Sequence, residues 1–205
     1  MRFQNPLTAI SPSLDMGVLY VLGRAEAAFT APGIQKLLPE AGSLAGVRKA
    51  LQRLTEQGIV LDEVVGRTHA YRLNREHLLA DAILAMAAAK SVLIDRIRNE
   101  IDSWDFVPAS VVLFGSAARN DMRTDSDVDI FIALPDEVDD DLADARIATL
   151  AARIAAWTGN DARPLVYRTS EISAAPVFDS IARDSLNIVG DADWLRKMVR
   201  KSRVA

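Results

Sequence analysis

Apolar residues in the first third of the chain recur at three- and four-residue intervals, the spacing of an amphipathic helix. After a short extended start over residues 3–10, a first helix is predicted over residues 14–22, with Ser13 as its N-cap. A second, shorter helix is predicted over residues 34–38. The chain is therefore expected to open with two helices close together in sequence.

A third helix is predicted between Ser43, which can cap its start, and Gly58, which ends it. One side of this helix is apolar. The apolar residues are Val47, Leu51 and Leu54. The other side carries Arg48, Lys49, Gln52 and Arg53. The third helix thus has a side suited to a core and a basic side suited to solvent or to an anionic partner.

Two β-type runs follow, over residues 59–65 and 68–73, and Gly66-Arg67 between them predicts a hairpin. Three helices and a hairpin over residues 10–75 resemble a winged helix-turn-helix DNA-binding domain. The resemblance implies that the third helix enters the major groove and that the hairpin tip contacts the DNA backbone. Winged helices also serve as protein–protein modules, and a basic helix side can simply be solvated. The implied DNA contacts are Ser43, Arg48, Lys49, Arg53 and Arg67, with Arg72 as a further candidate.

From Asn74 the helical pattern continues for nearly thirty residues and predicts one connecting helix over residues 76–104. Its apolar side either forms the interface of a homodimer or packs on the sheet of its own domain. The domains expected from these patterns are residues 1–75, the connecting helix, and residues 105–205.

A short β-type run, residues 111–114, breaks at Gly115-Ser116. Glycine lacks a Cβ, so backbone N–H groups at such a turn can converge on an anion. The Ser116 hydroxyl adds a hydrogen-bond donor, and Arg119 adds a fixed positive charge. The pattern predicts a phosphate site at this turn.

A second β-type run opens with Asp127 and Asp129. Residues two apart on a strand point to the same face, so the two carboxylates lie side by side. Like charges at that separation repel unless a cation lies between them, and Mg²⁺ prefers oxygen ligands. The spacing predicts a site for Mg²⁺ or Mn²⁺.

Taken together, the Gly-Ser turn, an arginine three residues on and Ser-Asp-x-Asp opening a strand resemble the signature of the DNA polymerase β-like nucleotidyltransferase superfamily, in its small bacterial form. The resemblance implies that the turn holds a nucleoside triphosphate such as ATP and that the aspartates bind the catalytic metal. One departure is Asn120, where the family often has glycine. The implied nucleotide-binding residues are Gly115, Ser116, Arg119 and Ser126, and the implied catalytic metal ligands are Asp127 and Asp129.

The remaining elements follow the order strand, turn, strand, helix, strand that this superfamily uses, so the resemblance implies an α+β domain. In the family, a third acid on the strand after the next helix takes the proton from the attacking hydroxyl. That strand has no carboxylate at its centre, and the best alignment puts Val166 in the acid's place; Asp161 and Glu171 are the nearby substitutes. The predicted elements are a helix over 140–157, a strand over 162–167, a helix over 176–183, a strand over 186–189 and a last helix from 191.

Composition and charge restrict the class of protein and the compartment expected for this chain. The chain has 205 residues and no cysteine, which excludes disulfides and thiolate zinc sites. No apolar span of 18 residues and no leader pattern are present, so a cytoplasmic protein is expected. The net charge is −4, but residues 1–76 hold nine Lys/Arg against seven Asp/Glu, and the remainder holds fifteen against twenty-one. The N-terminal part, which is slightly positive, therefore suits a nucleic-acid partner better than the negative remainder does.

Two functions follow from these observations. The first is an enzyme, tethered to DNA, that moves a nucleoside monophosphate from an NTP to a hydroxyl acceptor. The second is a DNA-binding regulator or antitoxin whose nucleotidyltransferase-like domain senses nucleotide without turnover. Acceptors in the family include antibiotics, RNA ends and partner proteins, and some members are the antitoxin half of a toxin–antitoxin pair.

Overall fold

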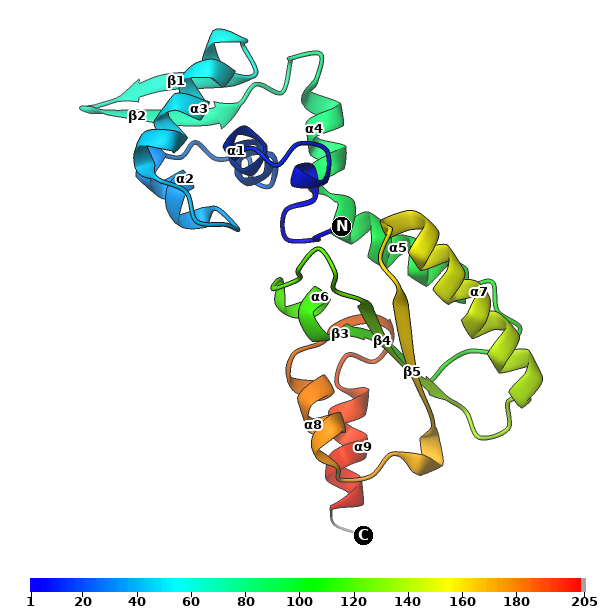
Figure 1. Cartoon of the computed structure of the whole chain (residues 1–205). Coiled ribbons are helices and arrows are strands. Elements are labelled where there is room, and N and C mark those ends of the chain that lie inside the picture. The colour runs from blue at the N-terminus through cyan, green and yellow to red at the C-terminus, as the bar shows by residue number, and fades with distance from the viewer. Residues whose placement is uncertain (204–205) are drawn as a thin grey trace. The chain divides into compact units, whose positions relative to one another are not determined.

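The computed structural model describes residues 1–203, which form two compact units (Figure 1). The N-terminal unit comprises Arg2–Lys90, and the C-terminal unit comprises the chain from Ser91 onward together with Met1. Within the described residues, no helix combines the length and the apolar character needed to cross a bilayer. Each unit has its own hydrophobic core and is described by itself.

The N-terminal unit begins with a 3₁₀ helix, η1 (Pro6–Ala9), where an extended segment was expected. Phe3 and Leu7 are buried, with 1% and 0% of their surface exposed. Leu7 of this one-turn helix packs in the core of the unit, which the short sequence pattern did not indicate. The expectation of an extended start over residues 3–10 was therefore wrong.

Three α-helices follow, each beginning at a side chain that caps it. Ser13, Thr30 and Ser43 accept hydrogen bonds from the backbone N–H groups of Met16, Gly33 and Gly46. The apolar side predicted for the third helix is buried in the core of the unit. The helices are α1 (Leu14–Gly23), α2 (Ala31–Leu37) and α3 (Leu44–Glu56).

An antiparallel hairpin completes this unit, as the two β-type runs predicted. Its strands are β1 (Val60–Val65) and β2 (Thr68–Leu73), paired from Val65–Thr68 to Val60–Leu73. Gly66 adopts a φ of 64° at the turn, a conformation that glycine reaches without strain. Val60 and Leu73 at the base of the hairpin join the core formed by the helices.

The segment predicted as one connecting helix contains two helices, α4 (Ala80–Ala87) and α5 (Ala89–Ile101). Ile83 and Ala87 of α4 pack in the core of the N-terminal unit. Residues of α5 belong to the C-terminal unit, where Arg98 Nε donates to the carbonyl oxygen of Ile188 at 3.1 Å. The division after Lys90 thus falls inside the expected connecting helix. Ile83 and Ile97 are buried within the two units, whereas Leu78, Leu79 and Val92 are exposed, so the dimer seam stays a prediction.

The C-terminal unit contains a four-stranded mixed sheet of order β5-β4-β3-β6. β4 pairs in parallel with β5, whereas β3 pairs antiparallel with both β4 and β6. This arrangement confirms the predicted mixed α+β class. The strands are β3 (Ser110–Phe114), β4 (Val128–Leu134), β5 (Ala162–Arg168) and β6 (Leu186–Gly190).

Helices pack against this sheet (Figure 1). α7 (Asp140–Thr158) connects the parallel strands β4 and β5. α8 (Pro176–Arg183) and α9 (Trp194–Ser202) pack against the face of the sheet that carries Phe131 and Ala133. These helices begin within about three residues of the predicted positions, because Asp139 caps α7 and Pro176 starts α8.

Candidate nucleotide and metal site

The turn after β3 and the acids of β4 lie next to each other. Phe114, the last residue of β3, pairs with Asp129 across the antiparallel ladder. The next residue, Gly115, has a φ of 67°, and a Cβ added there would lie 2.3 Å from Oδ2 of Asp129. Only glycine allows the backbone of the turn to approach this carboxylate so closely.

Asp127 and Asp129 stand together at the start of β4. Burial, and then the neighbouring Asp127 carboxylate, raise the pKa of Asp129, while Arg163 and Arg119 act in the opposite direction. The charged form of Asp129 is therefore less favourable than that of an exposed aspartate. A divalent cation shared by the two carboxylates would relieve this repulsion, so the residues present fit one Mg²⁺ or Mn²⁺ ion.

The turn itself forms a short helix, α6 (Gly115–Arg119), that ends at Asn120. Asn120 adopts the left-handed conformation, with a φ of 61°. Asparagine tolerates this conformation better than most residues, which accounts for its presence where the family often has glycine. The departure thus preserves the backbone path. Arg119 at the end of α6 pairs through Nε with Oδ2 of Asp121 at 3.1 Å.

Ser126 lies in the connection that leads to Asp127. Its Oγ accepts a hydrogen bond from the backbone N–H of Arg123 at 2.8 Å, and its carbonyl oxygen accepts one from Asn160 Nδ2 at 2.8 Å. Asn160 is buried, with 4% of its surface exposed, and no sequence pattern predicts this contact. In the structure Ser126 therefore orders the connection, and its role in nucleotide binding stays a prediction.

The strand beside the acid pair presents an arginine. In the parallel ladder Arg163 pairs with Asp129, and Arg163 Nε lies 2.7 Å from Oδ2 of Asp127. Val166 pairs with Ile132, on the opposite face from Asp129, so the alignment of Val166 with the third acid was wrong. Sequence reasoning missed Arg163, because the register of two strands separated by a helix cannot be read from either strand alone.

Neither proposed substitute joins the pair. Glu171 Oε2 accepts a hydrogen bond from the backbone N–H of Arg168 at 2.6 Å and so caps the 3₁₀ turn η2 (Thr169–Glu171). Asp161 precedes β5, and its carbonyl oxygen accepts from the N–H of Val128 at 2.8 Å. Across residues 1–203, no three His, Asp or Glu side chains come together as a set able to hold a metal ion.

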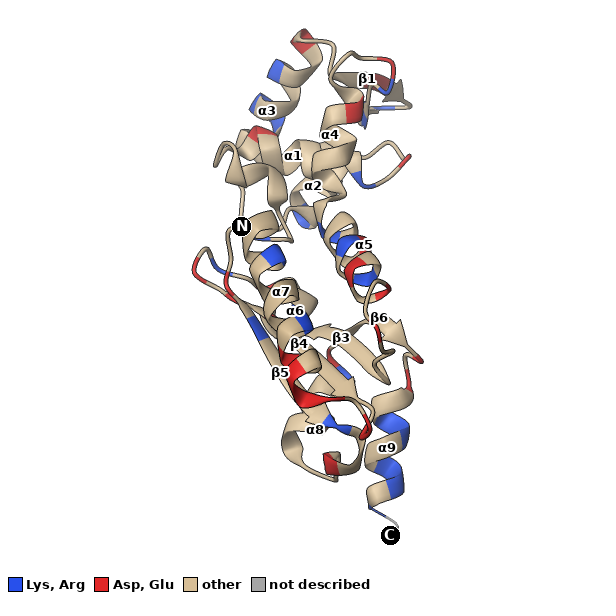
Figure 2. Cartoon of the chain, turned by 90° about the vertical axis from the view of Figure 1, so that its right-hand side faces the viewer, with Lys and Arg blue, Asp and Glu red and all other residues tan. Residues whose placement is uncertain are grey.

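The candidate DNA contacts separate into three kinds. Arg48 of α3 and Arg67 of the hairpin turn line one hollow of about 570 Å³ in the N-terminal unit. Lys49, the residue after Arg48 on α3, is exposed, and the basic residues of α3 are visible in Figure 2. Arg53 is instead held by Asp15 of α1, with Nε 3.2 Å from Oδ2, and the hydroxyl of Ser43 is used as the N-cap of α3.

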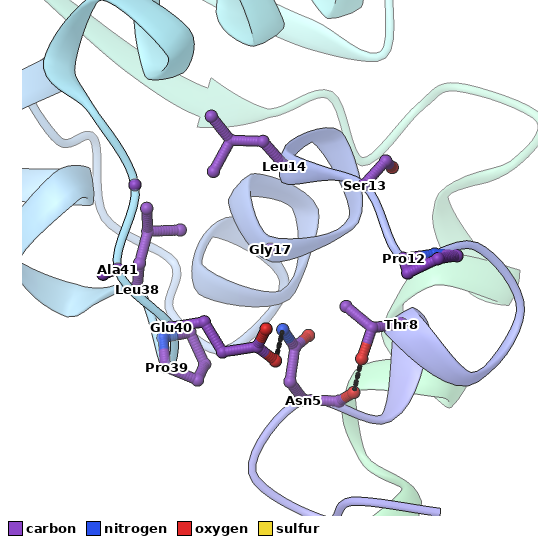
Figure 3. Close-up of a pocket in the computed structure, with 11 residues that line it drawn as sticks. Asn5, Thr8, Pro12, Ser13, Leu14, Gly17, Leu38, Pro39, Glu40 and Ala41 are labelled. Carbon is purple, nitrogen blue, oxygen red and sulfur yellow. Dashed lines mark hydrogen bonds between the residues drawn. The ribbon is translucent and has the colours of Figure 1, made fainter. Parts of the chain in front are cut away.

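A second hollow, of about 220 Å³, lies between η1, the start of α1 and the segment that joins α2 to α3 (Figure 3). The side-chain N–H₂ of Asn5 donates to Glu40 Oε1 at 3.3 Å. Among the described residues, the side-chain oxygen of Asn5 is buried without a hydrogen-bond partner. None of the residues predicted to bind nucleotide, metal or DNA lines this hollow.

One comparison with known protein families covers the part of the chain that holds these residues. The family model described as the nucleotidyltransferase domain matches residues 94–176, a range that includes Gly115, Asp127, Asp129 and Arg163. This part of the chain is similar to nucleotidyltransferase domains. No curated protein matches the chain in sequence.

Several solved structures resemble part of the chain. A toxin–antitoxin structure with AMP-PNP is 16% identical, with a TM-score of 0.42, and the match covers 54% of this chain and 84% of that one. A mutant of the toxin–antitoxin MntA-HpeT is 14% identical, with a TM-score of 0.41 and the same coverage. A tri-AMPylated HEPN toxin from Shewanella oneidensis in complex with MNT antitoxin is 14% identical, with a TM-score of 0.39. That match covers 56% of this chain and 84% of the other.

Proposed function

We propose that the C-terminal unit transfers a nucleoside monophosphate from an NTP, with ATP as the first candidate, to a hydroxyl acceptor and releases pyrophosphate. One observation carries this proposal: the carboxylate of Asp129 lies against the Gly115 turn with Asp127 beside it, within the residues that match the nucleotidyltransferase domain. A polyphosphate chain and its metal ion require an anion-binding turn next to oxygen ligands.

Each residue of the site has a role in this reaction. Asp127 and Asp129 hold a divalent cation, which when bound neutralises charge on the phosphates. The Gly115 turn lets the backbone approach those phosphates, and Ser116 and Arg119 add a donor and a positive charge. Ser126 orders the connection before Asp127. Together these residues bind and orient the NTP.

The proton of the acceptor hydroxyl finds no third carboxylate beside Asp127 and Asp129 within the described residues. It therefore passes to water or to the substrate itself, which gives slower transfer than a positioned base would. Nucleotide binding does not depend on that proton. The proposal thus expects firm Mg²⁺-dependent NTP binding and modest turnover.

The test is the double substitution Asp127→Asn with Asp129→Asn. We expect it to abolish Mg²⁺-dependent binding of a fluorescent ATP analogue while the circular dichroism spectrum stays that of the wild type. The matched control is Asp141→Asn with Asp144→Asn, which makes the same charge change on the exposed side of α7. Wild-type nucleotide binding by the site variant would overturn the assignment.

We further propose that the N-terminal unit is a winged helix-turn-helix domain that binds DNA. The hollow shared by Arg48 and Arg67, with Lys49 exposed nearby, supports contact with phosphates from both the third helix and the hairpin. Arg48→Ala with Arg67→Ala should lower DNA affinity at low salt and flatten its dependence on salt. Arg53→Ala, which removes an arginine already paired with Asp15, is the control and should have a smaller effect.

A second function is a DNA-binding regulator or antitoxin whose C-terminal unit binds nucleotide without transferring it. The arginine found in place of a third carboxylate favours this candidate. Incubation with α-labelled ATP, Mg²⁺ and cell extract separates the two. A labelled small molecule, RNA or protein, a toxin partner included, establishes the enzyme, whereas binding with no labelled product supports the regulator.

A further inference from the structure

Arg163 is the one residue of β5 that both pairs with Asp129 in the ladder and forms an ion pair with Asp127. Its Nε lies 2.7 Å from Oδ2 of Asp127, and it is directly opposite Asp129. A carboxylate at this place would complete a set of three ligands, able to bridge two cations. The guanidinium instead brings a fixed positive charge to the same place.

Packing holds Arg163 on this side of the sheet. Side chains alternate along a strand, so Leu165 and Tyr167 of β5 share the face of Arg163. Both pack against the core beneath α8 and α9, where the rings of Tyr167 and Phe131 lie 6.4 Å apart. Turning Arg163 to the opposite face would expose these residues, so the arginine stays beside the acids.

The charges then limit how many metal ions the site accepts. Asp127 and Asp129 supply two negative charges, and Arg163 cancels one of them. With one divalent cation bound, the side chains and the ion are positive before the NTP phosphates are counted, and Oδ2 of Asp127 is already engaged by Arg163. Ions in two-metal sites lie only about 3.5–4 Å apart, and a second ion here would meet both the first ion and the guanidinium.

We propose that Arg163 takes the place of a second divalent cation: the site holds one ion, and the guanidinium supplies the other positive charge to the NTP phosphates. The inference rests on the function proposed above and deepens it. The Arg163 side chain is 71% exposed, and its Nε faces Asp127. Its Nη groups can therefore donate to phosphate oxygens, a geometry that arginine matches well.

The test counts bound Mn²⁺ by electron paramagnetic resonance, using the full-length chain and a non-hydrolysable ATP analogue. We expect one site-bound Mn²⁺ per chain in the wild type and two in Arg163→Asp, which supplies a third carboxylate. The Asp127→Asn with Asp129→Asn variant gives the background of ions bound elsewhere. Arg163→Lys, which keeps the positive charge, should retain one ion.

Nucleotide affinity gives an independent readout that does not require Arg163→Asp to fold. Arg163→Ala should bind the ATP analogue at least about tenfold more weakly, because a charged contact to phosphate is lost. Two Mn²⁺ in the wild type, one in a folded Arg163→Asp, or unchanged affinity in Arg163→Ala would each overturn the inference. A wild-type chain that binds neither Mn²⁺ nor the analogue would overturn the proposed function itself.

Discussion

Gly115 sets the distance between the backbone of the turn and the acid pair. Its φ of 67° is a conformation that residues with a side chain adopt at a cost, and the space of its missing Cβ is taken by the Asp129 carboxylate. Gly115 is therefore required both for the positive φ of the turn and for the close approach of the Asp129 carboxylate. A substitution here tests the site more sharply than removal of a charge, because the carboxylates themselves remain.

Gly115→Ala is expected to destabilise the fold by about 1–2 kcal/mol through its positive φ and to displace the Asp129 carboxylate. Gly159→Ala is the matched control, since Gly159 has a φ of 70° with nothing within 4 Å of its missing Cβ. Urea unfolding should show similar losses for the two variants. Mg²⁺-dependent ATP-analogue binding should fall only in Gly115→Ala. An equal loss of binding in both would show that backbone strain alone is responsible.

Some residues of the site could be predicted from sequence and others could not, for a physical reason. Asp127, Asp129 and Gly115 are close in sequence, and strand periodicity is enough to place the acids on one face. Arg163 lies beyond a helix of 19 residues, so its position depends on the register of β4 with β5. Register is set by packing of both faces, which no local pattern reports.

At the scale of elements, the end of β4 is tied to η2 through one carboxylate. Asp136 accepts hydrogen bonds from Thr169 Oγ1 at 2.9 Å and from Ser170 N and Oγ at 3.1 and 2.7 Å. The side-chain and backbone hydrogen bonds from Ser170, followed by that from Thr169, lower the pKa of Asp136. The carboxylate thus holds the segment after β5 against the segment after β4.

This link gives a pH-dependent prediction. Because the folded-state pKa of Asp136 is lowered, its stabilisation is present above the unfolded-state pKa and disappears as pH falls through the folded-state pKa. Asp136→Ala should therefore lower Tm at pH 7, and the gap to wild type should close in acid. Thermal unfolding across pH measures this gap. Asp144→Ala, on the exposed side of α7, should show no such closing, and a constant gap for Asp136→Ala would contradict the assigned hydrogen bonds.

Some helix boundaries depend on a nearby capping residue and can be predicted from sequence, whereas others depend on packing between distant residues. Capping residues such as Ser13, Ser43 and Asp139 mark helix starts that the sequence could predict. The break between α4 and α5 falls in the alanine-rich run 87–89, where no proline or glycine interrupts the helical pattern. The two helices pack in different cores: Ile83 of α4 packs in the N-terminal unit, and Ile97 of α5 is buried in the C-terminal unit.

At the scale of the whole molecule, the two units differ in charge as well as in core. Residues 1–90 carry ten Lys/Arg and eight Asp/Glu, leaving fourteen and twenty for the rest of the chain. The N-terminal unit is thus slightly positive and the C-terminal unit is negative. A negative unit is repelled by DNA phosphates, so any DNA affinity of the whole chain is expected to come from the N-terminal unit.

This separation predicts that the chain can be divided between α4 and α5. Fragments covering residues 2–88 and 89–205 each contain one core, so each should unfold cooperatively by circular dichroism. Mg²⁺-dependent ATP-analogue binding should remain with the second fragment, and DNA binding with the first. A cut after residue 104 removes α5 from its unit and is the control, since loss of the buried Leu93, Ile97 and Ile101 should destabilise the shortened fragment by several kcal/mol. Equal stability of the two C-terminal fragments would show that α5 is not part of that unit.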